Sequence, residues 1–370
     1  MKRSLLIIIM IISLFQTNVF SKVQNVLFYF NSDNDYRYDV MKKLDKIISN
    51  KAFKENISIK VDRFRSIFPE KDVFEDVYKE KNTKFADINS GDPSRLKDIL
   101  NDGDQILWIY SPGYLKNDKA RGFSEHFEPL LFDTSSKDFL NIKELEDILF
   151  KKYELIIIDH SLFSSIENIY ALRKNFDFLI ATQEIIPITG FPIDGFLNSL
   201  KDKDTGNSIE AIFSDVKKEY GAKTNGWWGV PIRYQMSLIN SDSIDRLILH
   251  FRFFTRILIQ EYKKTHSEIL RARSMSVKFN DDYVDIDSFL SNLKKVRVSR
   301  ALKEQADNLK MILSKVISRQ YFQRPQNVAS GGLSVFFPLN GILPEGYDVS
   351  EFSKNTGWND FLSILISEDQ

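Results

Sequence analysis

The chain has 370 residues, and its 51 lysines and arginines are balanced by 51 aspartates and glutamates, so its formal net charge is zero. A nucleic-acid-binding protein needs an excess of positive charge to contact phosphates, and this balance argues against that class of partner. The sequence contains no cysteine, which excludes thiol catalysis, disulfide bonds and a lipid anchor on an N-terminal cysteine.

The first residues have the pattern of a secretory signal peptide. Lys2 and Arg3 precede an apolar run at 5–12, and residues of modest size lie before a cleavage point ahead of Lys22. The alternative is an uncleaved anchor, but this run is shorter than the roughly 20 residues that span a bilayer. We therefore predict that residues 1–21 are removed. The mature protein is then exported, periplasmic or extracellular, and has no stable membrane span.

Short apolar runs alternate with amphipathic stretches through the first half of the mature chain. The alternation predicts strands separated by helices, including one helix at 38–48. Strands of this kind form a mainly parallel sheet that is covered on both faces, with ligands bound at the carboxyl ends of the strands. The predicted strands are 26–30, 57–64, 105–110 and 155–158.

The second half has a different pattern. From about residue 243 apolar residues recur at helical spacing, and they do so again at 301–317. Residues 331–338 return to strand character, and the last twenty residues predict a short helix with a polar tail. We accordingly divide the chain into a signal peptide (1–21), an α/β core (22–220), a mainly helical region (221–325), and a returning strand with a C-terminal helix packed on the core (326–370).

Four segments, in order along the chain, resemble the clostripain family of cysteine peptidases. Residues 29–36 are similar to an early family strand that ends in an Asp-Asn-Asp type turn. Residues 158–170 resemble the F-D-A-C-L-M segment and its following helix, and residues 332–338 resemble G-L-S-I-Y-F-P. Between them, residues 181–184 are similar to A-S-E-E and precede a proline and a G-W-P pattern. The individual matches in these two middle segments are Asp159, Leu162, Glu167, Tyr170, Ala181, Glu184, Pro187, Gly190 and Pro192.

The resemblance implies a caspase-like α/β/α sandwich with a mainly parallel sheet and a helical C-terminal elaboration. It also implies a thiolate nucleophile, an assisting histidine and cleavage after a basic residue. Here both catalytic positions are replaced, because Ser161 stands at the cysteine position and Ser111 at the histidine position. A hydroxyl needs a neighbouring base to become a useful nucleophile, and Ser111 cannot serve as one.

We therefore expect a catalytically silent member of the family. His160 is adjacent to Ser161 and could in principle act as a relocated base, but neighbouring side chains at a strand end point to opposite faces. An active but atypical hydrolase that uses Ser161 remains the alternative. No motif predicts a metal site or a cofactor.

A degenerate site can still bind a peptide or protein partner. In the family, the position of Asp159 lies near the pocket for a basic side chain, so its carboxylate is a candidate partner for lysine or arginine. Alternatively, Asp159 simply accepts hydrogen bonds from loop amides. A third possibility is a structural protein of the cell envelope, with the cleft filled by its own side chains. The candidate ligand-binding residues are Asp159, Ser111, Gly113, Ser161, Thr182 and Glu184.

Overall fold

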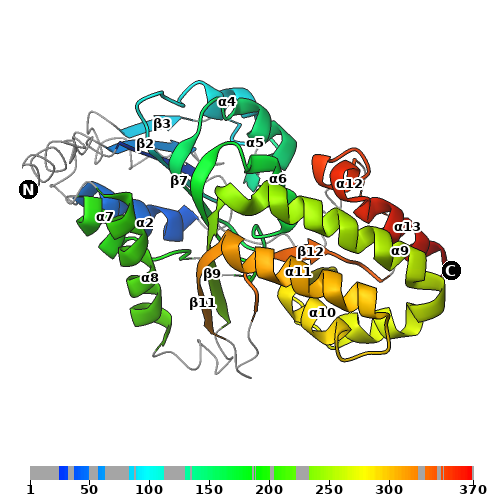
Figure 1. Ribbon diagram of the computed structural model, residues 1–370. Helices are drawn as coiled ribbons and strands as arrows, with labels where there is room; N and C mark the ends of the chain where they lie inside the picture. The colour runs from blue at the N-terminus through cyan, green and yellow to red at the C-terminus, as the bar shows by residue number, and fades with distance from the viewer. Residues whose placement is uncertain are drawn as a thin grey trace, which may run out of the picture.

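An eight-stranded mixed sheet forms the centre of the computed structural model (Figure 1). The structure describes residues 25–31, 37–49, 57–62, 83–86, 89–111, 130–133, 136–185, 187, 189–200, 204–221, 233–323, 330–339, 343–344 and 346–368. The predicted signal peptide and Gly113 lie outside the described residues.

In spatial order the strands are β11 (Ile317–Gln323), β9 (Tyr234–Asn240), β8 (Phe176–Ala181), β7 (Tyr153–Asp159), β4 (Ile106–Tyr110), β1 (Val26–Asn31), β2 (Ile57–Asp62) and β3 (Thr83–Ala86). The strands from β8 through β3 in this order pair in parallel, whereas β9 pairs antiparallel with both of its neighbours, β8 and β11. The central strand β4 is fully buried, and β7 is buried except at Glu154, as expected for strands covered on both faces.

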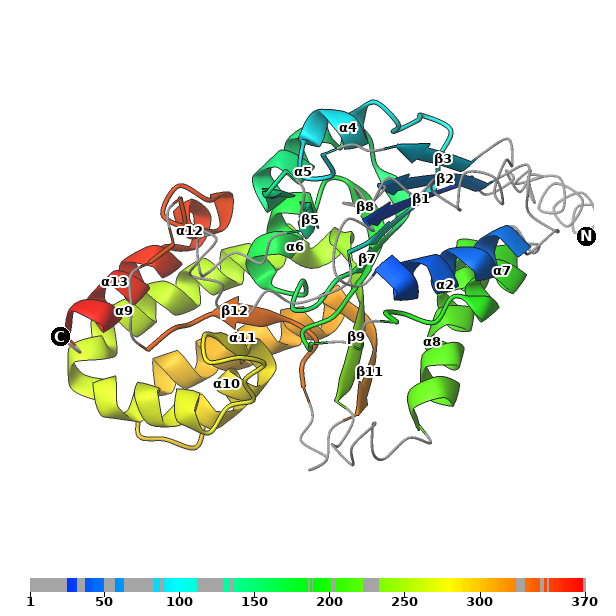
Figure 2. The ribbon, with the colours of Figure 1, turned by 180° about the vertical axis from the view of Figure 1, so that it is seen from behind.

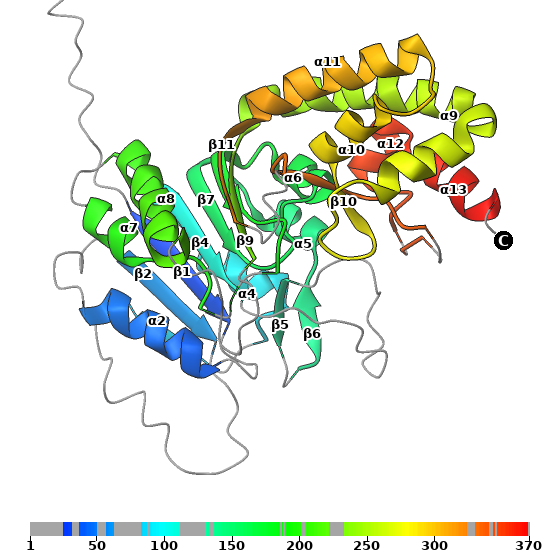
Figure 3. The same ribbon diagram turned by 90° about the horizontal axis from the view of Figure 1, so that it is seen from below.

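Three helices cover one face of this sheet (Figure 3). Because side chains alternate along a strand, Phe28 and Trp108 point to this face. The indole ring of Trp108 lies 5.0 Å from the ring of Phe196 in an edge-on contact. The three helices are α2 (Arg37–Ser49), α7 (Asp194–Ser199) and α8 (Thr205–Gly221).

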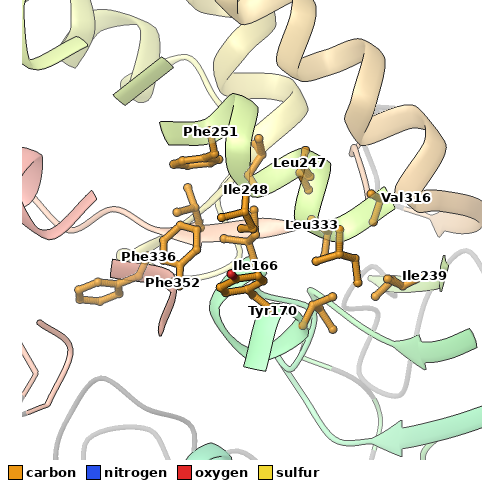
Figure 4. Packing of buried hydrophobic residues seen from close by; sticks show 14 of the residues in the cluster. Ile166, Tyr170, Ile239, Leu247, Ile248, Phe251, Val316, Leu333, Phe336 and Phe352 are labelled. Atoms are coloured by element: carbon orange, nitrogen blue, oxygen red, sulfur yellow. The ribbon is translucent and has the colours of Figure 1, made fainter. Parts of the chain in front are cut away.

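The opposite face carries a larger helical layer, which extends away from the sheet (Figures 1 and 2). Residues of α6 and α9 share one apolar cluster with the sheet residue Ile239 (Figure 4). Several of these helices begin at a side chain that caps the first turn, such as Asn141 in a capping box and Ser299. The helices of this layer are α4 (Pro93–Lys97), α5 (Ile142–Ile148), α6 (Ile166–Leu172), α9 (Ile244–Ser274), α10 (Ile286–Leu293) and α11 (Arg300–Val316).

Two small antiparallel pairs lie outside the main sheet. The strands β5 (Leu130–Asp133) and β6 (Asp138–Leu140) form one, and β10 (Tyr283–Asp285) pairs with β12 (Ser334–Phe336) in the other. The predicted returning strand at 331–338 is therefore present as β12, but its hydrogen-bonded strand partner is β10.

The C-terminal segment forms two helices where the sequence predicted one. Gly357 adopts a φ of +71°, a left-handed conformation that glycine adopts without steric cost and that ends α12 (Glu351–Thr356). The chain then starts α13 at Trp358, which runs to Glu368. The strands and helices predicted in the first half and the long helices predicted from residue 243 are otherwise present, with ends shifted by one to two residues.

Candidate functional site

Ser111, Asp159 and Ser161 lie together at the carboxyl edge of the sheet. Tyr110 and Asp159 are paired at the ends of β4 and β7, and the amide of Ser111 donates a hydrogen bond to the Asp159 carbonyl over 3.2 Å. The end of the neighbouring strand β8 places Thr182 and Glu184 at the same edge. All five of these candidate residues are buried, with exposed fractions of 0 to 3%.

The hydroxyl of Ser111 has a structural partner. Its Oγ accepts a hydrogen bond from the amide of Leu131 over 2.9 Å, and the Ser111 carbonyl lies 2.7 Å from Nδ1 of His160. Ser111 thus connects the end of β4 to β5 and orients the His160 ring.

His160 is turned toward Ser111. Because a carbonyl oxygen can only accept, Nδ1 carries the proton of this hydrogen bond. Burial of the ring lowers the pKa of His160 to about 4, against the opposing effect of the hydrogen bond to the Ser111 carbonyl, so the imidazole is neutral at neutral pH. Within the described part of the chain Nε2 has no hydrogen-bond partner. No hydrogen bond therefore joins Nε2 to the Ser161 hydroxyl.

The backbone after β7 makes a sharp turn into α6. Leu162 has a φ of +60°, which is rare for a residue with a branched side chain and persists only where the surroundings enforce it. Its amide donates to the Glu184 carbonyl over 3.2 Å, and its buried side chain packs on Val277 and Phe279. The turn that carries Ser161 is thus fixed on both sides.

Thr182 stabilises the adjacent turn after β8. Its Oγ1 accepts a hydrogen bond from the Glu184 amide over 2.9 Å, and its backbone carbonyl accepts one from the Ser164 amide over 2.8 Å. These bonds hold the strand-end turns of β7 and β8 against each other.

A lysine that the sequence analysis did not consider lies on the carboxylate of Asp159. Lys43 of α2 donates to Oδ2 of Asp159 in a buried ion pair, and the Phe191 amide donates to Oδ1 over 2.9 Å. Burial raises the pKa of Asp159 and lowers the pKa of Lys43, and the attraction between the two charges opposes both shifts. Asp159 thus accepts a loop amide, as one of the two hypotheses expected, and also holds a basic side chain, which belongs to its own chain.

One sequence signal could have revealed Lys43. It lies four residues before Ile47, which is buried, and residues at this spacing share one helix face. A lysine on the inward face of an amphipathic helix needs an acidic or carbonyl partner, and this requirement points to a buried carboxylate.

A second buried group of polar side chains stabilises the site from the side of the helical layer. Gln183 Nε2 donates to Asp285 Oδ2 over 3.0 Å, and the Gly331 amide donates to the same oxygen over 2.7 Å. The backbone amide of Gln183 donates to Oε1 of Gln235 over 2.6 Å. Burial raises the pKa of Asp285 to about 6, although hydrogen bonds from Ser288, Gln183 and Gly331 oppose the shift. No local sequence pattern indicates this group, because its members lie far apart along the chain.

Metal-binding clusters and membrane-spanning helices are both absent from the described residues. No group of three or more histidine, cysteine, aspartate or glutamate side chains there is arranged to hold a metal ion. In the same residues no helix is both long enough and apolar enough to cross a membrane.

The fold has counterparts among solved structures. The chain superposes on a secreted C11 cysteine protease from Bacteroides thetaiotaomicron, bound to an irreversible peptide inhibitor, with a TM-score of 0.65 and 15% identity; the match covers 91% of this chain and 99% of that one. An inactive zymogen C11 protease from Parabacteroides distasonis gives a TM-score of 0.62 and 17% identity over 90% of this chain and 97% of that one. These likenesses show the caspase-like α/β/α fold with its helical C-terminal elaboration.

The family that the sequence matches agrees with the fold. No curated protein matches the chain. The model of the clostripain family matches residues 28–364, which include most of β1, the strand-end residues and most of α13. The chain therefore belongs to the clostripain family.

Proposed function

We propose that this protein is an exported pseudopeptidase, which retains the peptidase scaffold without its chemistry and binds a peptide or protein partner at the carboxyl edge of the sheet. The observation that carries the proposal is the pair of serines at the catalytic positions, with the neighbouring imidazole hydrogen-bonded to the Ser111 carbonyl. The scaffold is that of an enzyme family, but Nε2 of His160 makes no hydrogen bond to the Ser161 hydroxyl.

The chemical consequence is a loss of nucleophilic activation. A serine hydroxyl attacks a peptide carbonyl only when a base accepts its proton. When the nucleophile and base of a serine peptidase are removed together, a residual acceleration of about 10³ to 10⁴ over water is left. With serines at both catalytic positions, the protein is comparable to such a variant, so we expect no useful peptide hydrolysis.

The strand-end turns support a binding role. Leu162 keeps its strained φ of +60°, and the hydrogen bond between Ser164 and Thr182 keeps the turns of β7 and β8 together. Backbone strain is retained only where the surrounding structure enforces it. The turns that carry Ser161 and Thr182 thus keep a defined backbone conformation, as the binding of a partner at this edge requires.

Export is supported by two observations. Residues 1–21 have the pattern of a secretory signal peptide, and a structural neighbour is described as a secreted protease. The same site would then meet its partner in the periplasm or outside the cell.

A structural role in the envelope is the second candidate. The observation in its favour is the burial of Ser111, Asp159, Ser161, Thr182 and Glu184, none of which is more than 3% exposed. A site filled by its own chain would stabilise the fold and bind nothing.

The test of catalytic silence is a pair of replacements, Ser161→Cys with Ser111→His. We expect the unmodified protein to release no product from a panel of peptides that differ in the residue before the scissile bond, lysine and arginine included, and the double variant to gain measurable hydrolysis of some of them. Ser161→Cys alone is the matched control, since a thiol without its histidine should remain nearly inactive. Hydrolysis by the unmodified protein that disappears in Ser161→Ala would contradict the proposal.

The proposed binding of a peptide or protein partner has its own test, which also distinguishes it from a structural role in the envelope. Peptides selected from a displayed library by the purified protein should protect the backbone amides at 159–164 and 182–184 from hydrogen exchange. Selected peptides that protect only other surfaces, or a library that yields no binder, would favour the structural candidate.

A further inference from the structure

The ammonium group of Lys43 is enclosed on several sides at the end of β7. Besides its ion pair with Asp159, Nζ donates a hydrogen bond to the Thr189 carbonyl over 3.3 Å. It lies 4.2 Å from the centre of the Tyr110 ring and 5.2 Å from that of the Trp108 ring. Both distances are within the range of cation–π attraction. A carboxylate, a carbonyl and two aromatic rings together complement a primary ammonium ion.

The carboxylate that receives Lys43 is itself held in place. Phe191 donates its amide to Oδ1 over 2.9 Å, and the indole N–H of Trp108 lies 3.4 Å from Oδ2. Gly190 lies directly against the carboxylate with a φ of +64°, and a Cβ at this position would come within 2.4 Å of Oδ1 of Asp159. Only a glycine leaves room for this contact.

Another lysine on the same helix provides a comparison. Lys46 pairs with Asp194 over 2.8 Å, but its side chain is 48% exposed and that of Asp194 is 62% exposed. The side chains of Lys43 and Asp159 are 5% and 0% exposed. Surface pairs such as Lys46 and Asp194 contribute little to stability, whereas a buried ion pair requires excellent geometry to offset the loss of solvation.

We propose that Asp159, Trp108 and Tyr110 form a receptor for a primary alkylammonium group and that Lys43 is its internal occupant. A lysine or arginine of a partner then has no access to this carboxylate, and the partner is recognised without a basic side chain at this position. The receptor is inferred from the contacts and distances around Lys43 alone. The consequence for the partner makes the proposed function more specific and rests on that function.

Chemical rescue of a truncated lysine tests the receptor. Lys43→Ala removes three methylene groups and the ammonium, which together correspond to n-propylammonium. We expect Lys43→Ala to lower the melting temperature and n-propylammonium to restore part of the loss in a saturable manner. The unmodified protein and Lys46→Ala should not respond, and neither should the double variant Lys43→Ala with Asp159→Ala. The receptor is refuted if 1-propanol restores Lys43→Ala equally well, or if n-propylammonium stabilises the unmodified protein to the same extent.

A measurement on the unmodified protein covers the case in which Lys43→Ala does not fold. Reductive methylation of the native protein, quantified residue by residue by mass spectrometry, compares Lys43 with Lys46. An occupied receptor predicts that Lys43 reacts at least about tenfold more slowly, which corresponds to about 1.4 kcal/mol. Equal rates would refute the occupancy.

Peptide binding tests the consequence for the partner. The probes are two short peptides that differ only by lysine or norleucine at one position. We expect the unmodified protein to bind both equally and Lys43→Ala to prefer the lysine peptide by about tenfold, again about 1.4 kcal/mol. A lysine preference in the unmodified protein would overturn the internal occupancy. If neither protein binds either peptide, the partner-binding function fails, and the receptor is decided by the chemical rescue.

Discussion

At the scale of single residues, Glu167 on α6 is a buried carboxyl group with a measurable effect on stability. Its Oε1 accepts hydrogen bonds from the Phe336 amide and the Tyr347 hydroxyl, both over 2.9 Å, while Oε2 has no hydrogen-bond partner among the described residues. Burial raises the pKa of Glu167 from 4.5 to about 7, although the hydrogen bond from Phe336 opposes the shift. A raised pKa means that the folded protein binds this proton more tightly than the unfolded chain does.

The sign of the pH effect follows from this difference. The contribution of Glu167 to the free energy of unfolding is fully present below pH 4.5 and is lost as the pH rises through about 7. Glu167→Gln stays neutral at all pH values, so we expect it to gain about 3 kcal/mol relative to the unmodified protein between about pH 4 and pH 8. Urea unfolding at both pH values measures the difference.

The control is Glu304→Gln on α11. Glu304 is 57% exposed and pairs with Arg300 on the surface, so its replacement should change stability by less than about 0.5 kcal/mol at either pH. An equal response of the two variants to pH would show that the burial of Glu167 does not raise its pKa.

The residues of the site were only partly predictable from the sequence. Ser111 and Ser161 were placed at strand ends because apolar runs mark where β4 and β7 stop, and neighbouring parallel strands end at one edge. Lys43 was missed because its burial depends on Asp159, which lies 116 positions away in the chain. The bond between His160 and the Ser111 carbonyl was missed for the same reason, since a local pattern gives the direction of a side chain but not its distant partner.

At the scale of secondary-structure elements, Asp285 connects α10 to two other parts of the site. It caps α10 by accepting a hydrogen bond from the Ser288 amide over 2.8 Å, and its other oxygen accepts from Gln183 and from the Gly331 amide. Asp285→Ala removes the cap and leaves buried donors without partners. We expect a loss of about 3 to 5 kcal/mol in the free energy of unfolding, measured by urea denaturation.

Asn141→Ala is the matched helix-cap control. Asn141 and Glu144 form a capping box at the start of α5, in a partly buried position, and loss of such a cap costs about 1 kcal/mol. If Asp285→Ala cost no more than Asn141→Ala, the bonds to Gln183 and Gly331 would contribute nothing to stability.

The elements themselves were more predictable than their pairing. The parallel part of the sheet was predicted because buried strands read as continuous apolar runs. The edge strand β11 was not, since none of its residues Ile317–Gln323 is fully buried and the strand follows α11 without a break. The pairing of β12 with β10 depends on contacts across about fifty residues, which hydrophobic periodicity does not specify.

At the scale of the whole molecule, the two ends of the described chain share one hydrophobic core. Leu27 of β1 and Leu365 of α13 belong to the same cluster of buried residues. Arg173, next to α6, forms ion pairs with Asp245 of α9 and Glu351 of α12 over 2.9 and 2.7 Å. The C-terminal helices are thus joined to the layer that covers the sheet, and we expect the chain to unfold as one cooperative unit.

Trp358 tests this cooperativity, because it packs at the centre of the C-terminal contact. Its ring lies 5.2 Å from that of Phe251 on α9 and 5.3 Å from that of Phe337, and its indole N–H donates to the Phe336 carbonyl over 2.8 Å. Trp358→Ala should lower the free energy of unfolding by about 3 to 5 kcal/mol. In a cooperative molecule the loss moves the whole transition, so calorimetry should show a single peak at a lower temperature.

The comparison is Met311→Ala on α11, where the side chain is 50% exposed and its loss should change stability by less than about 0.5 kcal/mol. Two separate transitions in Trp358→Ala, with the larger one unshifted, would show that the C-terminal helices unfold independently of the sheet. In that case the strand-end turns would not depend on the C-terminal layer. A single shifted transition means instead that the strained turn at Leu162 is maintained by the stability of the entire fold.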